Sequence, residues 1–495
     1  MSVNKENIKI IFGLKLKQAR KEKMLSLAKL SESSGLSISY LNEIEKGKKY
    51  PKPDKILSIS EALDLNFDEL VSLKLEKRLS PLSTLIKSDV LNEIPLDFFG
   101  IDSKKLVGLL AEAPTRVNAF ISAILEIARD HQLNQEHFYY SALRAYQELH
   151  LNYFEEIEEI VASCIRTFGL NKKGLTIHEL KKTLIDHYKY TFENIDTNKF
   201  PNLKGLRSIL KTGEESVLYT NPTLQDSQML FILGREIAFN FLKLENRPLT
   251  FSHHKAKNFD EVLNNFKASY FSVALLINEN ELYTDLEGFF ESQTFEPEKI
   301  EQLLEKYNVS PEMLFQRLTN ILPQKMGIKN LFFLRFNNDN HSNYFYLNKE
   351  LHLNKLHNPH GNKLEEHYCR RWITIDVLKD LSKQQINLKK NKNIIKAQRS
   401  SYIDSKNEYL CISIARSMYP TPNANSSVTL GLLINDKLKK GIQFLEDPNI
   451  ITRKVNATCE RCRLTECEER VAPPIVVKKL IKIKAIEDEV NKLIN

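Results

Sequence analysis

Three of the six cysteines lie close together near the C-terminal end of the 495-residue sequence: Cys459, Cys462 and Cys467. A Cys-x-x-Cys pair on a turn lets two thiolates bind one metal centre, and a third thiolate shortly after it can fold back onto the same centre. A fourth ligand has to come from elsewhere in the chain. Cys411 lies in an apolar, strand-like run and Cys164 in a helical pattern, where buried structural thiols are the common outcome. Cys369, which precedes the only tryptophan by three residues, is therefore the predicted fourth ligand.

The number of cysteines also indicates the compartment. Six cysteines in 495 residues are too few for a disulfide scaffold, whereas three close together in a reducing compartment indicate metal binding. No apolar run approaches the roughly 18 residues that a membrane-crossing helix needs, and Lys9 and Lys15 interrupt the opening stretch. The sequence therefore predicts a cytoplasmic protein that does not enter the membrane.

The N-terminal segment has the pattern of a small helical bundle. Apolar residues between Leu14 and Leu65 follow helical spacing broken by short turns, which predicts four or five short helices. Within LAKLSESSGLSISYLNEIEKGKKYPKP, Gly35 marks a tight turn between two helices and Ser37 an N-cap for the second. Gly47 follows just beyond the end of that second helix. This order is typical of a helix-turn-helix.

The formal net charge of +8 is modest for this length, but its placement is informative. Two basic clusters lie in the N-terminal segment: Lys15, Lys17, Arg20, Lys21 and Lys23, and then Lys46, Lys48, Lys49, Lys52 and Lys55. A DNA-facing surface would need basic residues here. The alternative is two solvated helix faces, which is the usual outcome for runs of charge.

Residues 8–72 resemble the Xre and lambda-repressor-like helix-turn-helix family. The family's Gly-Leu-Ser turn and its recognition helix ending in Ile-Glu-x-Gly are matched between Leu30 and Gly47, with Ser31 in place of the usual alanine. In that family the start of the recognition helix meets base edges, while nearby basic residues hold phosphates. The resemblance implies groove-facing roles for five residues and backbone contacts for three lysines: Ser37, Ser39, Tyr40, Asn42 and Glu43, then Lys46, Lys48 and Lys49.

Two apolar segments in the middle of the chain, MLFILGREIAFNFLKL and NNFKASYFSVALLINEN, are predicted to be helices that face a core. Their order resembles the metallopeptidase-like domain often fused to Xre readers, in which His-Glu-x-x-His supplies two zinc ligands and a general base and an acidic residue on the second helix completes the site. Here Arg235 and Phe239 occupy the histidine positions and Lys267 the acidic position, so only Glu236 remains. These residues cannot hold zinc, and we expect no catalytic residues.

The whole chain resembles the short-chain fatty acyl-CoA regulators, which join an Xre reader, a metallopeptidase-like domain without the protease centre, and a C-terminal cysteine domain. Their Cys-Pro-Arg-Trp motif is matched from Cys369 to Trp372, with Arg370 replacing the proline. Their Cys-x-x-Cys-x4-Cys-x-x-Arg-Ala-x-Pro-Pro motif is matched from Cys459 to Pro474, with a valine replacing the alanine.

This resemblance implies a short-chain acyl-CoA ligand and a four-iron, four-sulfur (4Fe-4S) cluster on four thiolates: Cys369, Cys459, Cys462 and Cys467. Four thiolates suit zinc equally well by geometry, so zinc stays the alternative. Three nearby arginines would favour the thiolate form and offset the negative charge of a cluster: Arg461, Arg463 and Arg470.

Together these features predict a multidomain protein, in which an all-α lambda-repressor-like domain precedes a mainly helical α+β sensor region. The expected parts are a helix-turn-helix domain (8–72), a helical linker or dimerisation region (82–168), a degenerate metallopeptidase-like domain (170–330) and an α+β sensor domain with the cysteine cluster (331–495). The expected function is a sequence-specific transcriptional regulator that binds double-stranded DNA as a homodimer and is not an enzyme. Its rivals are a zinc-dependent protease acting on a regulatory partner, which lacks its zinc ligands here, and an antitoxin, which would not need so long a chain.

Overall fold

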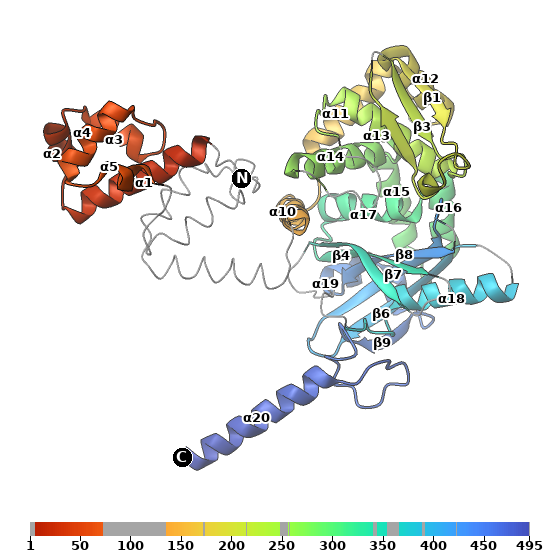
Figure 1. Cartoon of the computed structure of the whole chain (residues 1–495). Helices are drawn as coiled ribbons and strands as arrows, with labels where there is room; N and C mark the ends of the chain where they lie inside the picture. The colour runs from red at the N-terminus through yellow and green to blue at the C-terminus, as the bar shows by residue number, and fades with distance from the viewer. Residues whose placement is uncertain are drawn as a thin grey trace. The chain divides into compact units, whose positions relative to one another are not determined.

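The computed structural model describes residues 5–72, 135–171, 174–213, 215–247, 256, 258–339, 344–353, 366–388, 392–421 and 423–494 (Figure 1). The chain divides into two compact units: Met1–Ser141 with Ala256–Phe259, and Ala142–Lys255 with Asp260–Asn495. A helical N-terminal domain thus precedes a mixed helix and sheet region, which confirms the predicted fold class. Of the predicted linker, residues 82–134 lie outside the described residues.

Residues 5–72 of the N-terminal unit form five helices: α1 (Lys5–Glu22), α2 (Leu27–Ser34), α3 (Ile38–Glu45), α4 (Pro53–Leu63) and α5 (Phe67–Val71). The first residues of α10 (Gln135–Leu149), up to Ser141, also belong to this unit. The apolar faces of α1 to α5 form one core, in which Leu16, Leu41 and Ile44 are fully buried. Gly13 allows α1 to lie directly against α3, because a Cβ atom there would be 2.3 Å from the carbonyl oxygen of Ile44. The recognition helix is therefore positioned by backbone contact as well as by side chains.

The larger unit begins with helices around a small sheet. Its elements in chain order are α10 (Gln135–Leu149), α11 (Glu155–Phe168), α12 (Ile177–Tyr188), β1 (Tyr190–Asn194), β2 (Ser208–Lys211), β3 (Ser216–Thr220), α13 (Asp226–Phe241), α14 (Phe259–Leu276), α15 (Glu279–Phe290), α16 (Pro297–Tyr307) and α17 (Pro311–Lys325). The three strands are ordered β1-β3-β2, with β1 parallel and β2 antiparallel to β3. Both segments predicted as core helices, α13 and α14, are helical and largely buried.

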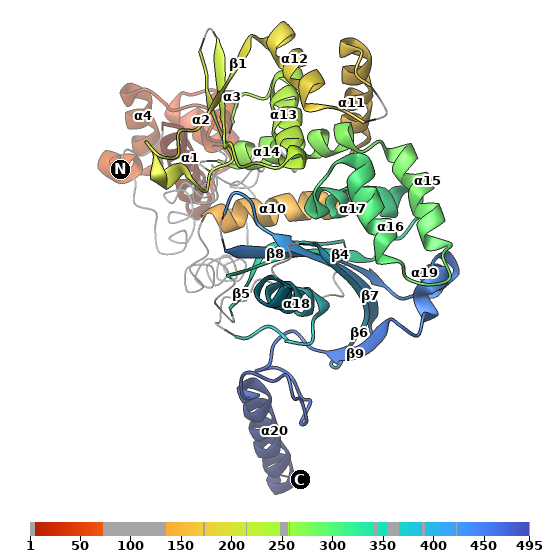
Figure 2. The same cartoon turned by 90° about the vertical axis from the view of Figure 1, so that its right-hand side faces the viewer.

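A six-stranded sheet with the order β5-β4-β8-β7-β6-β9 follows. The elements are β4 (Leu331–Asp339), β5 (Phe345–His352), α18 (Ile373–Leu388), β6 (Ile394–Tyr402), β7 (Glu408–Ser417), β8 (Ala424–Leu433), α19 (Asp436–Gly441), β9 (Ile451–Val455) and α20 (Ile475–Ile494). Only the pair β6 and β9 is parallel. Figure 2 shows α18 against one face of this sheet and α17 on the other side.

The central strands are apolar on both faces because both faces are covered. Successive side chains of a strand point to opposite faces. On β7, Ile412 and Ile414 join the core shared with α13 to α17, whereas Cys411 and Ala415 join the core beneath α18. The sheet thus forms the middle layer of this part of the larger unit.

A buried ion pair ties three helices of the larger unit together. The guanidinium of Arg317 on α17 donates to both carboxylate oxygens of Glu158 on α11, at 2.5 and 2.9 Å. The hydroxyl of Tyr270 on α14 donates to the same carboxylate at 2.7 Å, and Arg317 Nε donates to the carbonyl of Ile277 at 3.1 Å. Each buried charge therefore has partners.

Candidate DNA-binding surface and cysteine site

The turn before the recognition helix has the geometry that its sequence predicts. Gly35 ends α2 with φ at 68°, in the left-handed region that favours glycine. Ser37 caps α3, since its side chain accepts a hydrogen bond from the backbone N–H of Tyr40 at 3.2 Å. Gly47 adopts φ at 67° beyond the end of the helix. These three predictions are confirmed.

The residues predicted to meet DNA lie on the outer side of α3. Five of them are exposed and three are half-buried: Ser37, Ser39, Lys46, Lys48 and Lys49, and then Tyr40, Asn42 and Glu43. The opposite side of α3 packs into the core through Leu41 and Ile44. One face of the recognition helix is thus free to enter a major groove, although contact with bases stays a prediction.

Glu43 and Lys49 are not independent of each other. Lys49 Nζ lies 2.8 Å from the Glu43 carboxylate and 5.8 Å from the centre of the Tyr40 ring. The hydrogen bond lowers the pKa of Glu43 and raises that of Lys49. Glu43 therefore offsets part of the Lys49 charge, and the remaining N–H donors of the ammonium would make the contact with a phosphate.

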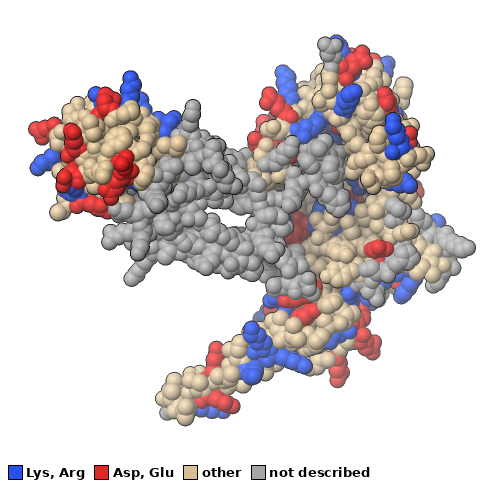
Figure 3. Space-filling model, viewed as in Figure 1, with Lys and Arg blue, Asp and Glu red and all other residues tan. Residues whose placement is uncertain are grey.

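The two basic clusters of the N-terminal segment differ in their contacts: the first includes residues bonded within the domain, and the second is exposed. Arg20 donates to both oxygens of Glu45 at 2.6 and 2.9 Å, and Lys15 Nζ donates to the carbonyl oxygens of Glu69 and Ser72 at 2.7 Å. The DNA-facing interpretation of the first cluster is wrong for these two residues, because they hold the domain together. The second cluster is exposed throughout. Figure 3 shows basic and acidic side chains interspersed on the visible face of this unit.

Protein groups fill the position at which the resemblance would place a zinc centre. Glu236 on α13 is buried and accepts hydrogen bonds from the Tyr190 hydroxyl at 2.9 Å and from Arg247 at 2.5 Å. Arg235 donates to the side chain of Asn265 at 2.6 Å, and burial lowers its pKa to about 10. The guanidinium of Arg247 also stacks 4.3 Å from the ring of Phe239. This set of cations and rings does not suit zinc.

The segment around Cys369 lies beside the C-terminal cysteines. Tyr368 forms an isolated antiparallel bridge with Thr458, the Cys369 N–H donates to Ala457, and the Cys459 N–H donates to His367. Cys369 is also close enough to Cys459 and Cys462 for their charges to interact. The predicted fourth ligand, more than eighty residues away in sequence, is thus next to two of the other three.

Two carboxylates and an arginine maintain this arrangement. Glu366 pairs with Arg461 at 2.7 Å and accepts from Thr458 at 2.6 Å, and Glu460 accepts from the His367 N–H at 3.0 Å. On the other side of the loop, Arg470 donates to the carbonyls of Cys459 at 2.8 Å and Cys462 at 3.3 Å. Sequence reasoning missed both carboxylates, because nothing in their spacing separates them from surface acids.

The arginines predicted to favour thiolates act on other groups. Arg461 pairs with Glu366, Arg463 lies 3.6 Å from Asp404, and Arg470 binds carbonyls. Arg370, which replaces the proline of the family motif, also interacts electrostatically with Cys369 and Cys459. The effect of the three other arginines on the thiolates stays a prediction.

The donor set suits a thiolate-bound metal, but the thiols do not converge on one point. Cys369, Cys459 and Cys462 are buried and Cys467 is half-buried. Burial raises the pKa of Cys369 to about 11, so metal binding there would have to release a proton. Among the described residues, no group of three or more His, Cys, Asp or Glu side chains is arranged to hold a metal ion. The cluster therefore stays a prediction.

Comparison with known proteins supports the N-terminal assignment. Residues 16–70 match the helix-turn-helix family model, so this part is an Xre-type helix-turn-helix domain, which supports a DNA-binding transcriptional regulator. No curated protein matches the chain. No described helix is long and apolar enough to cross a bilayer.

Two solved structures of regulators are similar to parts of the chain. A Mycobacterium tuberculosis transcriptional regulator is 15% identical, with 68% of this chain and 93% of that chain covered and a TM-score of 0.47. The apo form of the competence regulator ComR from Streptococcus vestibularis is 17% identical, with 65% and 88% covered and a TM-score of 0.13. Similarity at these levels implies nothing further about this chain.

Proposed function

We propose that the protein is a sequence-specific DNA-binding regulator in which α3 reads the major groove and the larger unit responds to a ligand. The observation that carries this proposal is the capped, well-anchored recognition helix with an exposed polar face. DNA as the partner places the protein in the cytoplasm. Its activity is binding, without catalysis by its own residues.

The DNA-binding proposal is tested by binding-site selection followed by titrations at several salt concentrations. Replacing Asn42 with alanine should relax sequence preference by about 1–3 kcal/mol at one base position. Lys48→Ala should weaken binding to all DNA sequences alike. The slope of log K against the logarithm of the salt concentration should become shallower by about one. Lys182→Ala, at an exposed lysine of α12 in the larger unit, is the matched control and should change neither. Equal binding of every sequence by the unaltered protein would refute the proposal.

We also propose that the protein is a homodimer held together through α20. Exposed apolar side chains recur along this helix at heptad-like spacing: Ile483, Ile486, Val490 and Leu493. Its first half carries lysines and its second half mainly acids, with Lys492 in the last turn: Lys478, Lys479, Lys482 and Lys484, and then Glu487, Asp488 and Glu489. An antiparallel pair of such helices places unlike charges opposite each other, so a second copy of this chain complements the surface. Figure 3 shows this division of charge along the helix.

The dimer is tested by light scattering of the full chain. Ile486→Asp with Val490→Asp should convert the dimer to a monomer and weaken binding to a two-half-site operator. Ala485→Asp introduces the same charge away from the apolar stripe and should leave the dimer intact. A monomeric unaltered protein, or a dimer that survives the double substitution, would contradict the role of α20.

For the cysteine site we propose a 4Fe-4S cluster, with zinc as the alternative, held by Cys369, Cys459, Cys462 and Cys467. What supports it is the pairing of the Cys369 segment with the Cys459 segment and the loop that Arg470 holds in place. A metal there would join two segments that are distant in sequence and so stabilise the larger unit. A cluster would in addition make the protein sensitive to oxygen.

Anaerobic purification with iron, sulfide and zinc analysis tests this proposal. Cys369→Ser should lose the metal, whereas Cys411→Ser should keep it. The two cysteines are matched, because both are buried in the same core beneath α18. Full metal content in Cys369→Ser would refute the fourth-ligand assignment, and zinc without iron would select the alternative.

The proposed small-molecule signal is a short-chain acyl-CoA, which rests on the sequence resemblance alone. If an acyl-CoA regulates the protein, the acyl-CoA and the DNA must change each other's affinity by the same factor. Titration of each in the presence of the other measures that factor, and a value of one would remove acyl-CoA from the proposal. The rival function is a zinc-dependent protease; among the described residues no His, Cys, Asp or Glu group suited to a metal surrounds Glu236, whose partners are Tyr190 and Arg247.

A further inference from the structure

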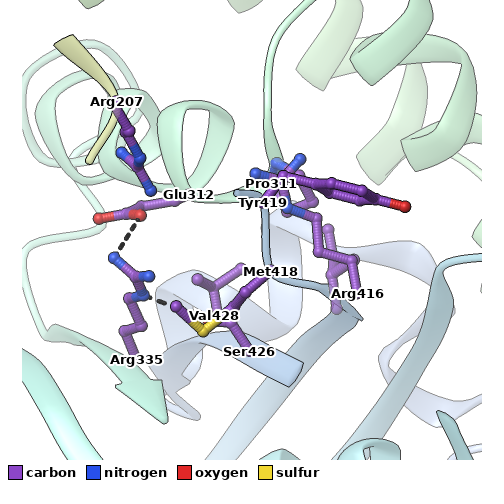
Figure 4. Close-up of a pocket in the computed structure, with 10 residues that line it drawn as sticks. Arg207, Pro311, Glu312, Arg335, Arg416, Met418, Tyr419, Ser426 and Val428 are labelled. Carbon is purple, nitrogen blue, oxygen red and sulfur yellow. Dashed lines mark hydrogen bonds and ion pairs between the residues drawn. The ribbon is translucent and has the colours of Figure 1, made fainter. Parts of the chain in front are cut away.

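A pocket rich in arginine lies where the small sheet, α17 and the six-stranded sheet of the larger unit meet. Its empty volume is about 350 Å³, counting the solvent at its mouth. Figure 4 shows three arginines approaching it from different elements: Arg207 from just before β2, Arg335 from β4 and Arg416 from β7. Among the described residues that line the pocket, Glu312 at the start of α17 supplies the single carboxylate.

The one carboxylate in the pocket is already paired. Arg335 donates to Glu312 Oε2 at 2.8 Å and to the Ser426 hydroxyl at 3.2 Å. Lys349 on β5 donates to the other oxygen of Glu312 at 2.6 Å. Although burial alone would raise the pKa of Glu312, Arg335, Lys349 and the charge of Arg207 hold it well below its usual value. The carboxylate is therefore ionised, and its single negative charge is shared among several cations.

The other two arginines are left in excess. The guanidinium of Arg207 makes no hydrogen bond to any described residue, and Arg416 makes one, to Gln225 at 3.3 Å. Burial lowers the pKa of both, to about 10 for Arg416, and each is repelled by the other arginines of the pocket. With one negative and three positive side chains, the lining carries a net charge of +2.

The helix α17 adds to this positive potential. Pro311 and Glu312 are the first residues of the 15-residue helix and line the pocket. Pro311 has no N–H, and the Ser310 side chain accepts from the Met313 N–H at 3.3 Å, so the helix adds to the positive potential through its dipole rather than through a row of free N–H groups. Burying surplus cations at such a place costs stability, and the cost is offset when an anion binds.

We infer that this arginine pocket binds the dianionic phosphate group of a small-molecule ligand. A carboxylate would neutralise only half of the net charge, whereas a phosphate monoester matches it and accepts from several guanidinium groups at once. The inference does not depend on the acyl-CoA proposal, since it concerns any ligand that carries a phosphate.

The position of the pocket gives binding a structural consequence. The segment before β2, the start of α17 and strands β4, β7 and β8 all contribute to its lining. A bound phosphate would draw these elements together, because each arginine belongs to a different one. Occupancy would therefore stiffen the junction between the small-sheet region and the six-stranded sheet.

Calorimetric titration of the full chain tests the inference, with inorganic phosphate, glycerol 3-phosphate, adenosine 3′,5′-bisphosphate and acetate as probes. At least one phosphate probe should bind, and Arg207→Met and Arg416→Met should each weaken that binding about tenfold or more. Arg166→Met, an exposed arginine of α11, is the matched control and should leave it unchanged. Thermal unfolding of each variant without ligand verifies that it is folded.

The probes also separate the sources of the phosphate. Binding of the bisphosphate alone identifies a nucleotide-bearing ligand, and binding of the smaller probes as well identifies a simple phosphate ester. Because the second pKa of a phosphate monoester is about 6, affinity should rise from about pH 5.5 to pH 7.5. Acetate binding as tight as phosphate, no binding of any phosphate probe, or equal binding by Arg207→Met and Arg416→Met would overturn the inference.

Discussion

The larger unit contains two buried arrangements of arginine and glutamate that differ in their balance of charge. Around Glu158, one arginine and one carboxylate face each other, and Tyr270 and a backbone carbonyl satisfy the remaining polar atoms. Around Glu312, Arg335 and Lys349 make the hydrogen bonds to the carboxylate, and Arg207 and Arg416 leave positive charge in excess of its one negative charge. A balanced network stabilises the fold, whereas an unbalanced one raises the energy of the unliganded protein. Buried charge therefore indicates a binding site only where the charges fail to cancel.

The largest effect is expected at the balanced pair. Glu158→Gln leaves the Arg317 charge buried without its anion, so the free energy of unfolding should fall by about 3–5 kcal/mol. Urea denaturation, followed by a spectroscopic signal from the larger unit, measures this loss. Glu159→Gln, at an exposed neighbouring position, is the control. Replacing both Glu158 and Arg317 with leucine should recover part of the loss. A loss below that of the control would show that the pair is not a stabilising contact.

A smaller loss is expected at the filled zinc position. Glu236→Gln removes the charge that pairs with Arg247 but keeps a group that can accept from Tyr190. The free energy of unfolding should fall by about 1–3 kcal/mol, since a partly buried guanidinium loses its ionic partner. Glu245→Gln, an exposed residue near by, is the control. An unchanged stability would mean that Glu236 is as dispensable here as a surface acid.

The ion pairs of the arginine pocket should affect how the free energy of unfolding falls at acid pH. The folded protein holds the pKa of Glu312 below its usual value of 4.5. Stabilisation from this carboxylate is therefore fully present above pH 4.5 and is lost as the pH falls below it. Glu312→Gln should flatten the fall in stability between about pH 5 and pH 3, whereas Glu298→Gln on α16 should not. If Glu312→Gln and the unaltered protein lost stability equally between about pH 5 and pH 3, the assignment of an ionised Glu312 would be refuted.

The smallest change in stability is expected for Arg416→Met, and it distinguishes the arrangement around Glu312 from the one around Glu158. In phosphate-free buffer, Arg416→Met should change the free energy of unfolding by no more than about 0.5 kcal/mol, or increase it, because it removes a surplus charge. The measurement is urea denaturation at constant ionic strength. A loss comparable to that of Glu158→Gln would show that Arg416 belongs to a balanced network, and the comparison between the two sites would fail.

Local sequence features explain how much of the N-terminal unit was predicted. Gly35, Ser37 and Gly47 act on backbone groups within a few residues, so their spacing alone predicts the turn and the caps. The basic clusters were harder, because a lysine or arginine has the same appearance in a sequence whether it faces DNA or a neighbouring helix. Arg20 pairs with Glu45, twenty-five residues away, and no local pattern announces that contact.

The sequence by itself determined the helix-turn-helix, the placement of Arg235 and Phe239 beside Glu236 and the grouping of three cysteines, since each depends on residue types at short spacing. Only the tertiary structure brought the Cys369 segment, and with it Arg370, against Thr458 and Cys459. The arginine pocket was invisible in the sequence, because its arginines lie far apart in the chain. They meet only because α17 packs on the six-stranded sheet, and the packing of distant elements leaves no local signature in the sequence.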